Sequence, residues 1–146
     1  MVTRSVFNRL LAGVAGATVV ALAGCAGGGM RTPEVKVMLR GANEVPSANS
    51  SASGSATFWV NADKTVSGMV QTTGLTGNAA HIHVGKSGTN GPVAVGLTQT
   101  SNGNWSVPAG ARFTDDQYRA YQAGDTYVNV HSAQFPGGEI RGQLRP

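Results

Sequence analysis

Three histidines are the residues of this chain whose spacing suggests shared chemistry. His81 and His83 lie one residue apart in the run 80–85, and His131 ends the run 127–131. Both runs have the composition of β-strands, in which successive side chains point to opposite faces. In each run the branched aliphatic residues fall on one face and the histidines on the other. If the two strands lie close together in one sheet, the three imidazoles converge.

Such a cluster is suited to holding one metal ion. Same-face neighbours on a strand are about 6.5–7 Å apart and opposed residues about 4.5–5.5 Å, and imidazoles bind metals at about 2.0–2.1 Å. Three neutral imidazoles without a thiolate favour Cu(II), Zn(II) or Ni(II), with copper strongest by intrinsic affinity. A fourth ligand can be water, the carboxylate of Glu44 or Glu139, or the thioether of Met38.

The same residues also allow a structural interpretation, which the sequence leaves open. The histidines can hydrogen-bond loop backbones and hold the turns that contain Glu44 and residues 135–139. Glu44 and Glu139 then orient imidazoles or pair with Arg141. The sequence leaves open whether the histidine cluster holds a metal ion or only the fold.

Other kinds of site find little support in the residues. The serines gather in residues 47–55, without a histidine or a nucleophile-elbow pattern, so we expect no nucleophilic enzyme. The glycine-rich run 86–91 lacks the Gly-Lys-Ser/Thr ending of a phosphate-binding loop. The basic residues are scattered and not interleaved with aromatics, which excludes a recognisable nucleic-acid surface.

The elements that position the histidines are predicted to be mostly strands. Alternating or apolar runs predict strands over residues 35–40, 56–60, 66–70, 92–97, 105–107 and 139–144, in addition to the two histidine runs. In the run 92–97 we expect Val93, Val95 and Leu97 to share one face. Thr114 and Gln117 form a capping-box pattern that starts one short helix near residues 115–122. We therefore predict an all-β fold, an antiparallel Greek-key sandwich or barrel with that single helix.

The N-terminal residues read as a targeting segment. A basic start and the apolar run 10–22, too short for a comfortable membrane span, indicate a signal peptide over residues 1–24. Residues 22–25 resemble the lipobox of bacterial lipoprotein precursors, in which cleavage precedes the cysteine and its thiol is lipidated. Cys25 is the only cysteine, so the domain has no internal disulfide and no thiolate ligand.

The rest of the chain is predicted to be a tether followed by one domain. Residues 25–32 form a flexible, glycine-rich tether, and residues 33–146 suffice for one domain and not for two. In lipoproteins the residue after the cysteine influences sorting, and here it is Ala26 and not Asp. We therefore expect a lipid-anchored protein of the cell envelope, at the outer membrane in preference, facing the periplasm or the exterior.

Several segments together resemble the CHRD domain, a family named after repeats in chordin and also found in bacterial secreted proteins. The matching segments are residues 39–46, 80–85, 90–93, 127–132 and 135–144. They follow the family order across nearly all of the domain. The resemblance implies a β-rich extracellular or periplasmic module, and the family lacks a generally established activity.

A looser similarity is to the copper/zinc superoxide dismutases, which are Greek-key barrels with a His-x-His pair and a late copper-binding histidine. His81, His83 and His131 follow that order. No fourth histidine is present to bridge two metals, and the zinc-loop histidines and disulfide cysteines are absent. A dinuclear dismutase site of that kind is therefore excluded.

Three functions follow as expectations. The first is an envelope protein that binds one metal ion, copper or else zinc, through the three histidines. The second is a structural or adhesive module that binds a protein or glycan partner while its histidines hold loops. A superoxide dismutase-like activity is a distant third.

Overall fold

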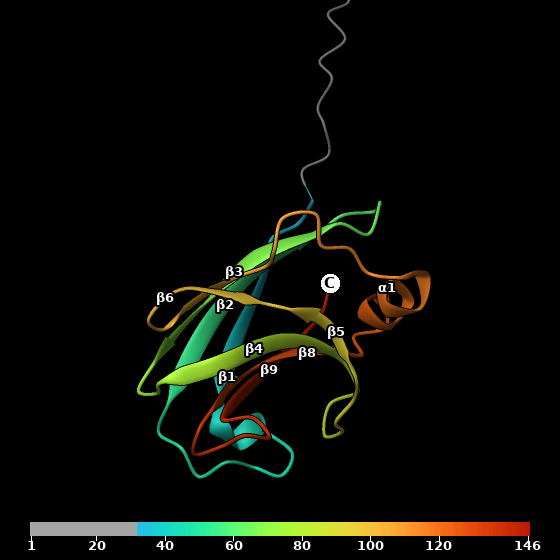
Figure 1. Ribbon diagram of the computed structural model, residues 1–146. Helices are drawn as coiled ribbons and strands as arrows, with labels where there is room; N and C mark the ends of the chain where they lie inside the picture. Colours follow the sequence, from blue (N-terminus) through green and yellow to red (C-terminus); the bar gives the residue numbers. More distant parts are fainter. Residues whose placement is uncertain (1–31) are drawn as a thin grey trace, which may run out of the picture. The chain divides into compact units, whose positions relative to one another are not determined.

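Strands are the main regular elements of the fold, which is seen in a computed structural model that describes residues 32–146. The strands are β1 (Val35–Arg40), β2 (Ser53–Val60), β3 (Val66–Thr73), β4 (Gly77–Val84), β5 (Val93–Gly96), β6 (Thr98–Ser101), β7 (Asn104–Ser106), β8 (Thr126–Ser132) and β9 (Ile140–Leu144). They form a sheet in the order β5-β4-β8-β9-β1-β2-β3-β7-β6, in which neighbouring strands run antiparallel (Figure 1).

The sheet curls into a nearly closed barrel. Its two edge strands, β5 and β6, are consecutive in the chain and separated only by Leu97. The backbone N–H of Leu97 donates to the carbonyl of Ala80 on β4 at 2.9 Å, so the turn between the edges is fastened to the sheet. Closure of this kind leaves little unpaired edge. The predicted antiparallel β fold is confirmed, in its barrel form.

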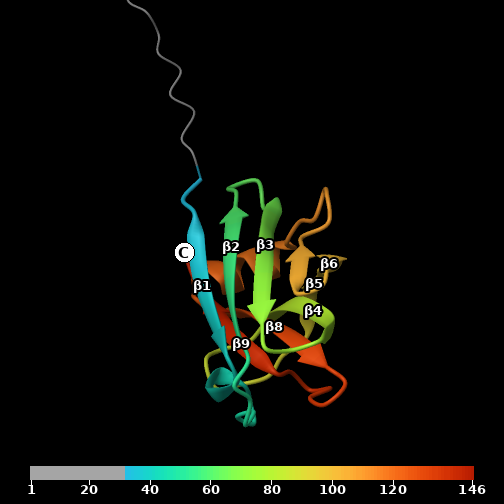
Figure 2. The ribbon, with the colours of Figure 1, turned by 90° about the vertical axis from the view of Figure 1, so that its left-hand side faces the viewer.

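The core lies inside the barrel and follows the predicted alternation. In β1, Val35, Val37 and Leu39 are buried while Lys36 and Met38 are exposed. The predicted hairpin is β2 and β3, which lie beside β1 (Figure 2). The other fully or almost fully buried apolar residues come from nearly every strand: Ala56, Phe58, Val60, Val66, Val70, Ala80, Ile82, Trp105, Val128, Val130, Ile140 and Leu144.

The predicted helix is present as α1 (Asp115–Gln122). Its capping box is complete: the Gln117 N–H donates to the Thr114 hydroxyl at 3.2 Å, and the Thr114 N–H donates to the Gln117 side chain at 2.8 Å. Tyr121 is buried and packs near Phe113, with ring centroids 6.2 Å apart. This contact gives a short helix the packing that it needs to persist.

Two expectations about the strands were wrong or incomplete. Val93 and Val95 do not share a face, because a bulge in the β4–β5 pairing lies between Ile82 and His83. Val95 is buried, whereas Val93 is 51% exposed. Strand β6 was not predicted, because all of its residues are polar and exposed and give no alternating signal. A 3-10 helix, η1 (Gly41–Asn43), also follows β1.

The N-terminal predictions lie outside the described residues. These are the signal peptide, the lipidation of Cys25 and all but the last residue of the tether. Within the part of the chain that the structure describes, no helix is both long and apolar enough to cross a membrane.

The junction between β1 and β9 requires glycine at position 142. A Cβ atom at Gly142 would lie 2.4 Å from Val37 Cγ1 and 2.5 Å from the carbonyl oxygen of Met38. We expect Gly142→Ala to lower the free energy of unfolding by about 1–3 kcal/mol, because neither atom can move aside cheaply. Denaturant unfolding of Gly142→Ala and of Gly137→Ala, where a Cβ meets no atom within 4 Å, provides the comparison. Equal stability of the two variants would contradict the prediction.

Candidate metal centre

The three histidines come together on the outer face of two neighbouring strands. Strands β4 and β8 pair antiparallel, with His81 opposite Asn129, His83 opposite Tyr127 and His131 opposite Ala79. Because side chains alternate, the aliphatic residues between them point into the core. The convergence that the sequence predicted is therefore present, and it arises from the register of one strand pair.

The distances suit a single ion. The ring centroids of His81 and His83 are 5.5 Å apart, those of His81 and His131 are 5.0 Å apart, and those of His83 and His131 are 6.3 Å apart. One potential ligand nitrogen from each ring lies within 4.8 Å of the others. Nitrogens bound to one ion at about 2.0–2.1 Å lie roughly 3–4 Å apart, so small ring rotations would bring all three within reach of one ion.

Backbone carbonyls fix the orientation of two of the rings. Nδ1 of His83 donates to the carbonyl oxygen of Gly91 at 2.9 Å, and Nδ1 of His131 donates to that of Pro136 at 2.9 Å. A carbonyl oxygen only accepts, so the proton of each neutral ring is on Nδ1 and Nε2 carries a lone pair. Metal-binding histidines are commonly held by such a bond on the other nitrogen.

The two lone pairs differ in their surroundings. Nε2 of His131 lies 3.1 Å from Nδ1 of His81. In the absence of metal, a proton on Nδ1 of His81 can therefore be donated in a hydrogen bond to Nε2 of His131. Nε2 of His83 is buried and has no hydrogen-bond partner. An unpaired buried acceptor costs free energy, and a metal ion would satisfy it.

The local electrostatics keep the pair on β4 neutral. Desolvation lowers the pKa of His81 below its usual value, and the charges of His131 and His83 lower it further. Desolvation is also the largest cause of the lowered pKa of His83, although its bond to Gly91 opposes the shift. Neutral imidazole is the form that binds metal.

An aromatic stack supports His83 from the side. The rings of His83 and Tyr127 are parallel, with centroids 4.7 Å apart. The guanidinium carbon of Arg141, on β9, lies 3.4 Å from the centroid of the Tyr127 ring. Because β8 lies between β4 and β9, the tyrosine ring is held between the cation and the imidazole. This stack restricts the plane of the His83 ring.

Arg141 also holds the loop that covers His83. Its side chain is 1% exposed and donates to the carbonyl oxygens of Lys86 at 3.2 Å and Thr89 at 2.8 Å, and to the side-chain oxygen of Asn90 at 3.1 Å. The next residue, Gly91, accepts from His83. The sequence predicted at most an ion pair for Arg141. The residue pattern of β9 does not mark this role, since Arg141 and Gln143 alternate with Ile140, Gly142 and Leu144 as solvent-facing residues of a strand would.

The other predicted ligands lie apart from the three-histidine group, which includes neither glutamate. Glu44 is buried, and desolvation raises the pKa of its carboxyl although the charge of Arg141 opposes this. Glu139 is buried and accepts from the hydroxyl of Ser50 at 2.7 Å. Met38 is 60% exposed on β1. A role for Glu44, Glu139 and Met38 as metal ligands stays a prediction.

The structural interpretation of the histidines, in which they hold loops through hydrogen bonds, is confirmed in part. His131 does hold the turn at residues 135–139, through Pro136, while His83 holds the loop 86–91 and not the turn at Glu44. Within residues 32–146, neither Glu44 nor Glu139 hydrogen-bonds an imidazole or forms an ion pair with Arg141. The histidines therefore contact loop backbones, as that interpretation expected, without help from the carboxylates.

Replacing Arg141 by lysine tests its hold on the loop. We expect Arg141→Lys to lower the free energy of unfolding by roughly 2–4 kcal/mol. An ammonium cannot reproduce the hydrogen bonds that the guanidinium donates to the loop, nor its contact with the Tyr127 ring. Arg40, directly opposite on β1 and exposed, supplies the control Arg40→Lys. Denaturant unfolding measures both, and hydrogen exchange of the Gly91 amide reports the loop. A variant as stable and as protected as Arg40→Lys would refute the role of Arg141.

Comparison with known proteins places the chain in one family. The model of the CHRD domain matches residues 35–144, which is most of the chain and nearly all of the described part. No curated protein and no solved structure gives a match. The matched segment includes all three histidines, Arg141 and the loop that covers His83. The chain therefore belongs to the CHRD domain family.

Proposed function

We propose that this CHRD domain binds a single transition-metal ion, copper in preference, through His81, His83 and His131. The supporting observation is the orientation of His83: its Nδ1 is held by the Gly91 carbonyl, its Nε2 is buried without a hydrogen-bond partner, and its ring lies beside those of His81 and His131. An orphaned buried acceptor costs about 1–3 kcal/mol, which a bound ion would remove.

The ligand chemistry supports copper or zinc over harder ions. Three imidazole nitrogens suit Cu(II), Zn(II) and Ni(II), whereas Mg²⁺ and Ca²⁺ prefer oxygen ligands. The order of intrinsic affinities favours copper. His81 and His131 are only partly buried, so a fourth position would face solvent and take a water molecule.

We further propose that the domain acts at the cell envelope, held to a membrane by lipid on Cys25 and at the outer membrane in preference. The support is the sequence alone: a basic start, an apolar run and a lipobox-like segment that ends in the cysteine. A domain in this place would bind metal ions outside the cytoplasm, in metal handling or in protection from excess copper.

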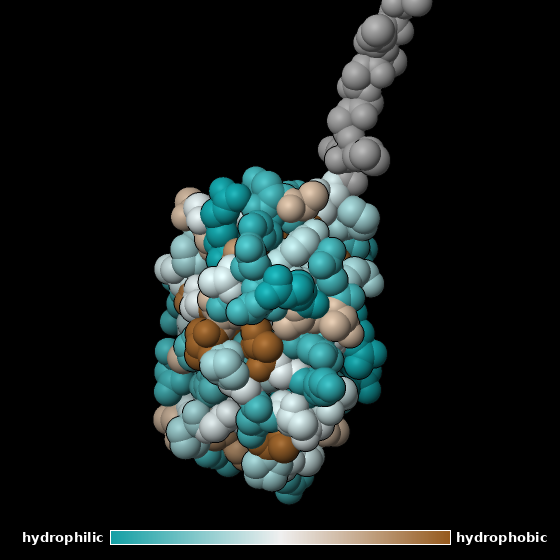
Figure 3. Space-filling model, turned by 90° about the vertical axis from the view of Figure 1, so that its right-hand side faces the viewer, coloured by the Kyte–Doolittle hydropathy of each residue, from teal (hydrophilic) through white to brown (hydrophobic). Residues whose placement is uncertain are grey.

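A second function is favoured by the same hydrogen bonds. Because His83 and His131 fasten two loops, the cluster can serve a structural or adhesive module whose loops bind a protein or glycan partner. One face of the molecule carries its strongly hydrophobic residues in small separate groups among hydrophilic ones (Figure 3). Such a face lacks the broad apolar patch of a tight protein interface, so a partner there would be recognised by polar contacts.

Copper titration separates the two functions. The protein is purified without a histidine tag and with Cys25→Ser, so that no other thiol or imidazole competes. We expect close to one equivalent of Cu(II) in calorimetry, with nitrogen ligation in electron paramagnetic resonance. His83→Asn and His131→Asn keep an amide donor near Nδ1 for the loop carbonyls and lose the ligand nitrogen. Each is expected to weaken binding by more than about 100-fold, while thermal stability without metal changes little.

The copper titration has a control variant and an outcome that would contradict the metal function. Asn78→Ala changes an exposed residue on the same strand and should bind copper normally. If the original protein shows no saturable binding of Cu(II) or Zn(II), the metal function is wrong. If the original protein binds no metal and the asparagine variants are as stable as it is, the histidines only fasten the two loops, which favours the structural function.

Anchoring is tested by cell fractionation. We expect the protein expressed in a bacterium with lipoprotein processing to sediment with membranes and to carry a lipid-dependent mass increase. Cys25→Ser should appear in the soluble or released fraction, because a thioether-linked lipid can no longer form. A matched Ser47→Ala variant, at an exposed loop position, should remain with membranes. Unchanged sedimentation of Cys25→Ser would contradict the lipid anchor.

A further inference from the structure

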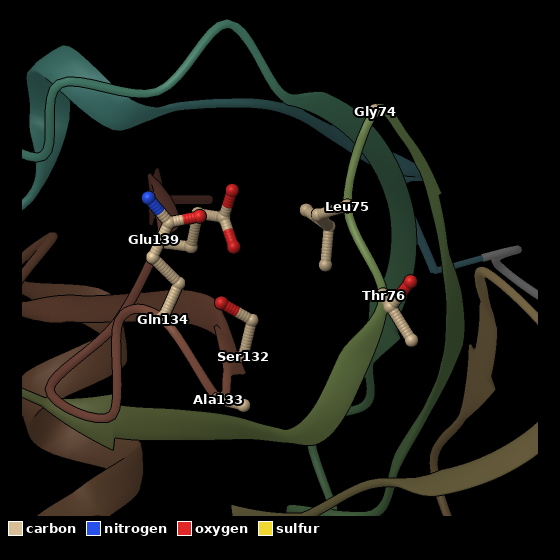
Figure 4. A pocket seen from close by; sticks show the side chains of 7 residues that line it. All are labelled: Gly74, Leu75, Thr76, Ser132, Ala133, Gln134 and Glu139. Carbon is tan, nitrogen blue, oxygen red and sulfur yellow. The ribbon is translucent and has the colours of Figure 1, made fainter.

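A cavity of about 510 Å³, which we call the Glu139 cavity, lies apart from the three histidines. It lies between the β3–β4 connection and the segment that follows β8 (Figure 4). Its lining residues are Gly74, Leu75, Thr76, Ser132, Ala133, Gln134 and Glu139. In Figure 4 the side chains of Leu75 and Glu139 extend toward each other from opposite walls, and the Ser132 hydroxyl points into the same space.

The carboxylate of Glu139 lacks a compensating cation. The residue is 5% exposed, and its Oε1 accepts one hydrogen bond, from Ser50 at 2.7 Å. Within residues 32–146 no Lys, Arg or His nitrogen lies within 4.0 Å of it. Buried charges in proteins are normally paired, because desolvation of a lone charge is costly. The cavity wall therefore presents a negative group with room for a positive partner.

The remaining lining groups complement such a partner. The Ser132 hydroxyl accepts from the backbone N–H of Phe135 at 3.2 Å and retains capacity for a further bond. Gln134 adds an amide oxygen at the rim, and Leu75 supplies an apolar wall. Ser132, Gln134 and Leu75 thus add two neutral acceptors and one apolar surface to the carboxylate of Glu139.

We propose that the Glu139 cavity binds a small organic cation with a primary ammonium group and a short alkyl chain. The ammonium carries three N–H donors, for which Glu139, Ser132 and Gln134 of the lining supply acceptor oxygens, and the alkyl chain would lie on Leu75. Cavities of about 300–1,000 Å³ hold small organic ligands. A Ca²⁺ ion needs six to eight oxygen ligands and usually several carboxylates, whereas this cavity has one.

The site is separate from the histidine cluster. Successive residues of β8 point to opposite faces, so Ser132 faces the cavity while His131 faces the outer surface. The three-histidine group does not include Glu139. Ammonium binding therefore does not rest on the proposed metal function, and it is measurable in metal-free protein.

Calorimetry and amide chemical shifts with pentylamine, in the presence of EDTA, test the proposal. We expect saturable binding with shift changes at residues 74–76 and 132–134. The neutral isostere 1-pentanol should bind at least about tenfold more weakly, because it loses the charge-assisted bond. Glu139→Gln should lower pentylamine affinity by a similar factor while retaining an acceptor for Ser50. Asp116→Asn removes an exposed carboxylate on α1 and serves as the control for net charge.

A second variant keeps the test decisive if Glu139→Gln unfolds. Ala133 is an exposed lining residue, so Ala133→Trp should fill the cavity and abolish binding without disturbing the core. The proposal is overturned if pentylamine does not saturate, if 1-pentanol binds equally well, or if Ala133→Trp binds as the original does. It is also overturned if Ca²⁺ binds in a Glu139-dependent way and pentylamine does not.

Discussion

The outer face of β4, β8 and β9 depends on the buried guanidinium of Arg141. Within residues 32–146 it is the one Lys or Arg that is fully buried. Its charge is accommodated by carbonyl oxygens of the loop 86–90, by the face of the Tyr127 ring and by the nearby charge of Glu44. Desolvation of a cation is costly, so these contacts must be kept together. The arginine thereby holds a loop over a sheet that already has its core on the other side.

The covering loop makes the histidine cluster an organised site. With the loop in place His83 is 8% exposed, and the Gly91 carbonyl is available to its Nδ1. The close approach itself needs glycine, since a Cβ at Gly91 would lie 1.7 Å from the Val84 carbonyl oxygen. At Gly138, beside the turn held by His131, a Cβ would lie 2.4 Å from Glu44 Oε1. Backbone, arginine and imidazoles therefore constrain one another.

The sequence predicted the local part of this arrangement and the convergence of the three histidines, and it missed the bulge and the contacts of Arg141. That His81 and His83 share a face follows from the strand period, and the capping box at Thr114 follows from contacts three residues apart. The proximity of His131 needed the pairing of β4 with β8, which spacing suggests and only the fold establishes. The bulge after Ile82, which exposes Val93, depends on strand pairing and leaves no mark in the residue pattern. The hydrogen-bond partners of Arg141 lie 51 to 55 residues away in the chain and are mostly main-chain oxygens, which carry no sequence signature.

A purely structural role for the histidines accounts for half of their geometry. The bonds to Gly91 and Pro136 use Nδ1 alone, and an asparagine amide supplies a donor near the same place. Such a role gives no reason for the other nitrogens to converge, or for His83 Nε2 to be buried without a partner. A proton on His81 resolves the contact with His131 and leaves His83 unsatisfied. One ion bound by all three rings would satisfy every lone pair while both loop bonds remain, so the proposed metal binding would account for the whole arrangement, whereas loop fastening accounts for a part of it.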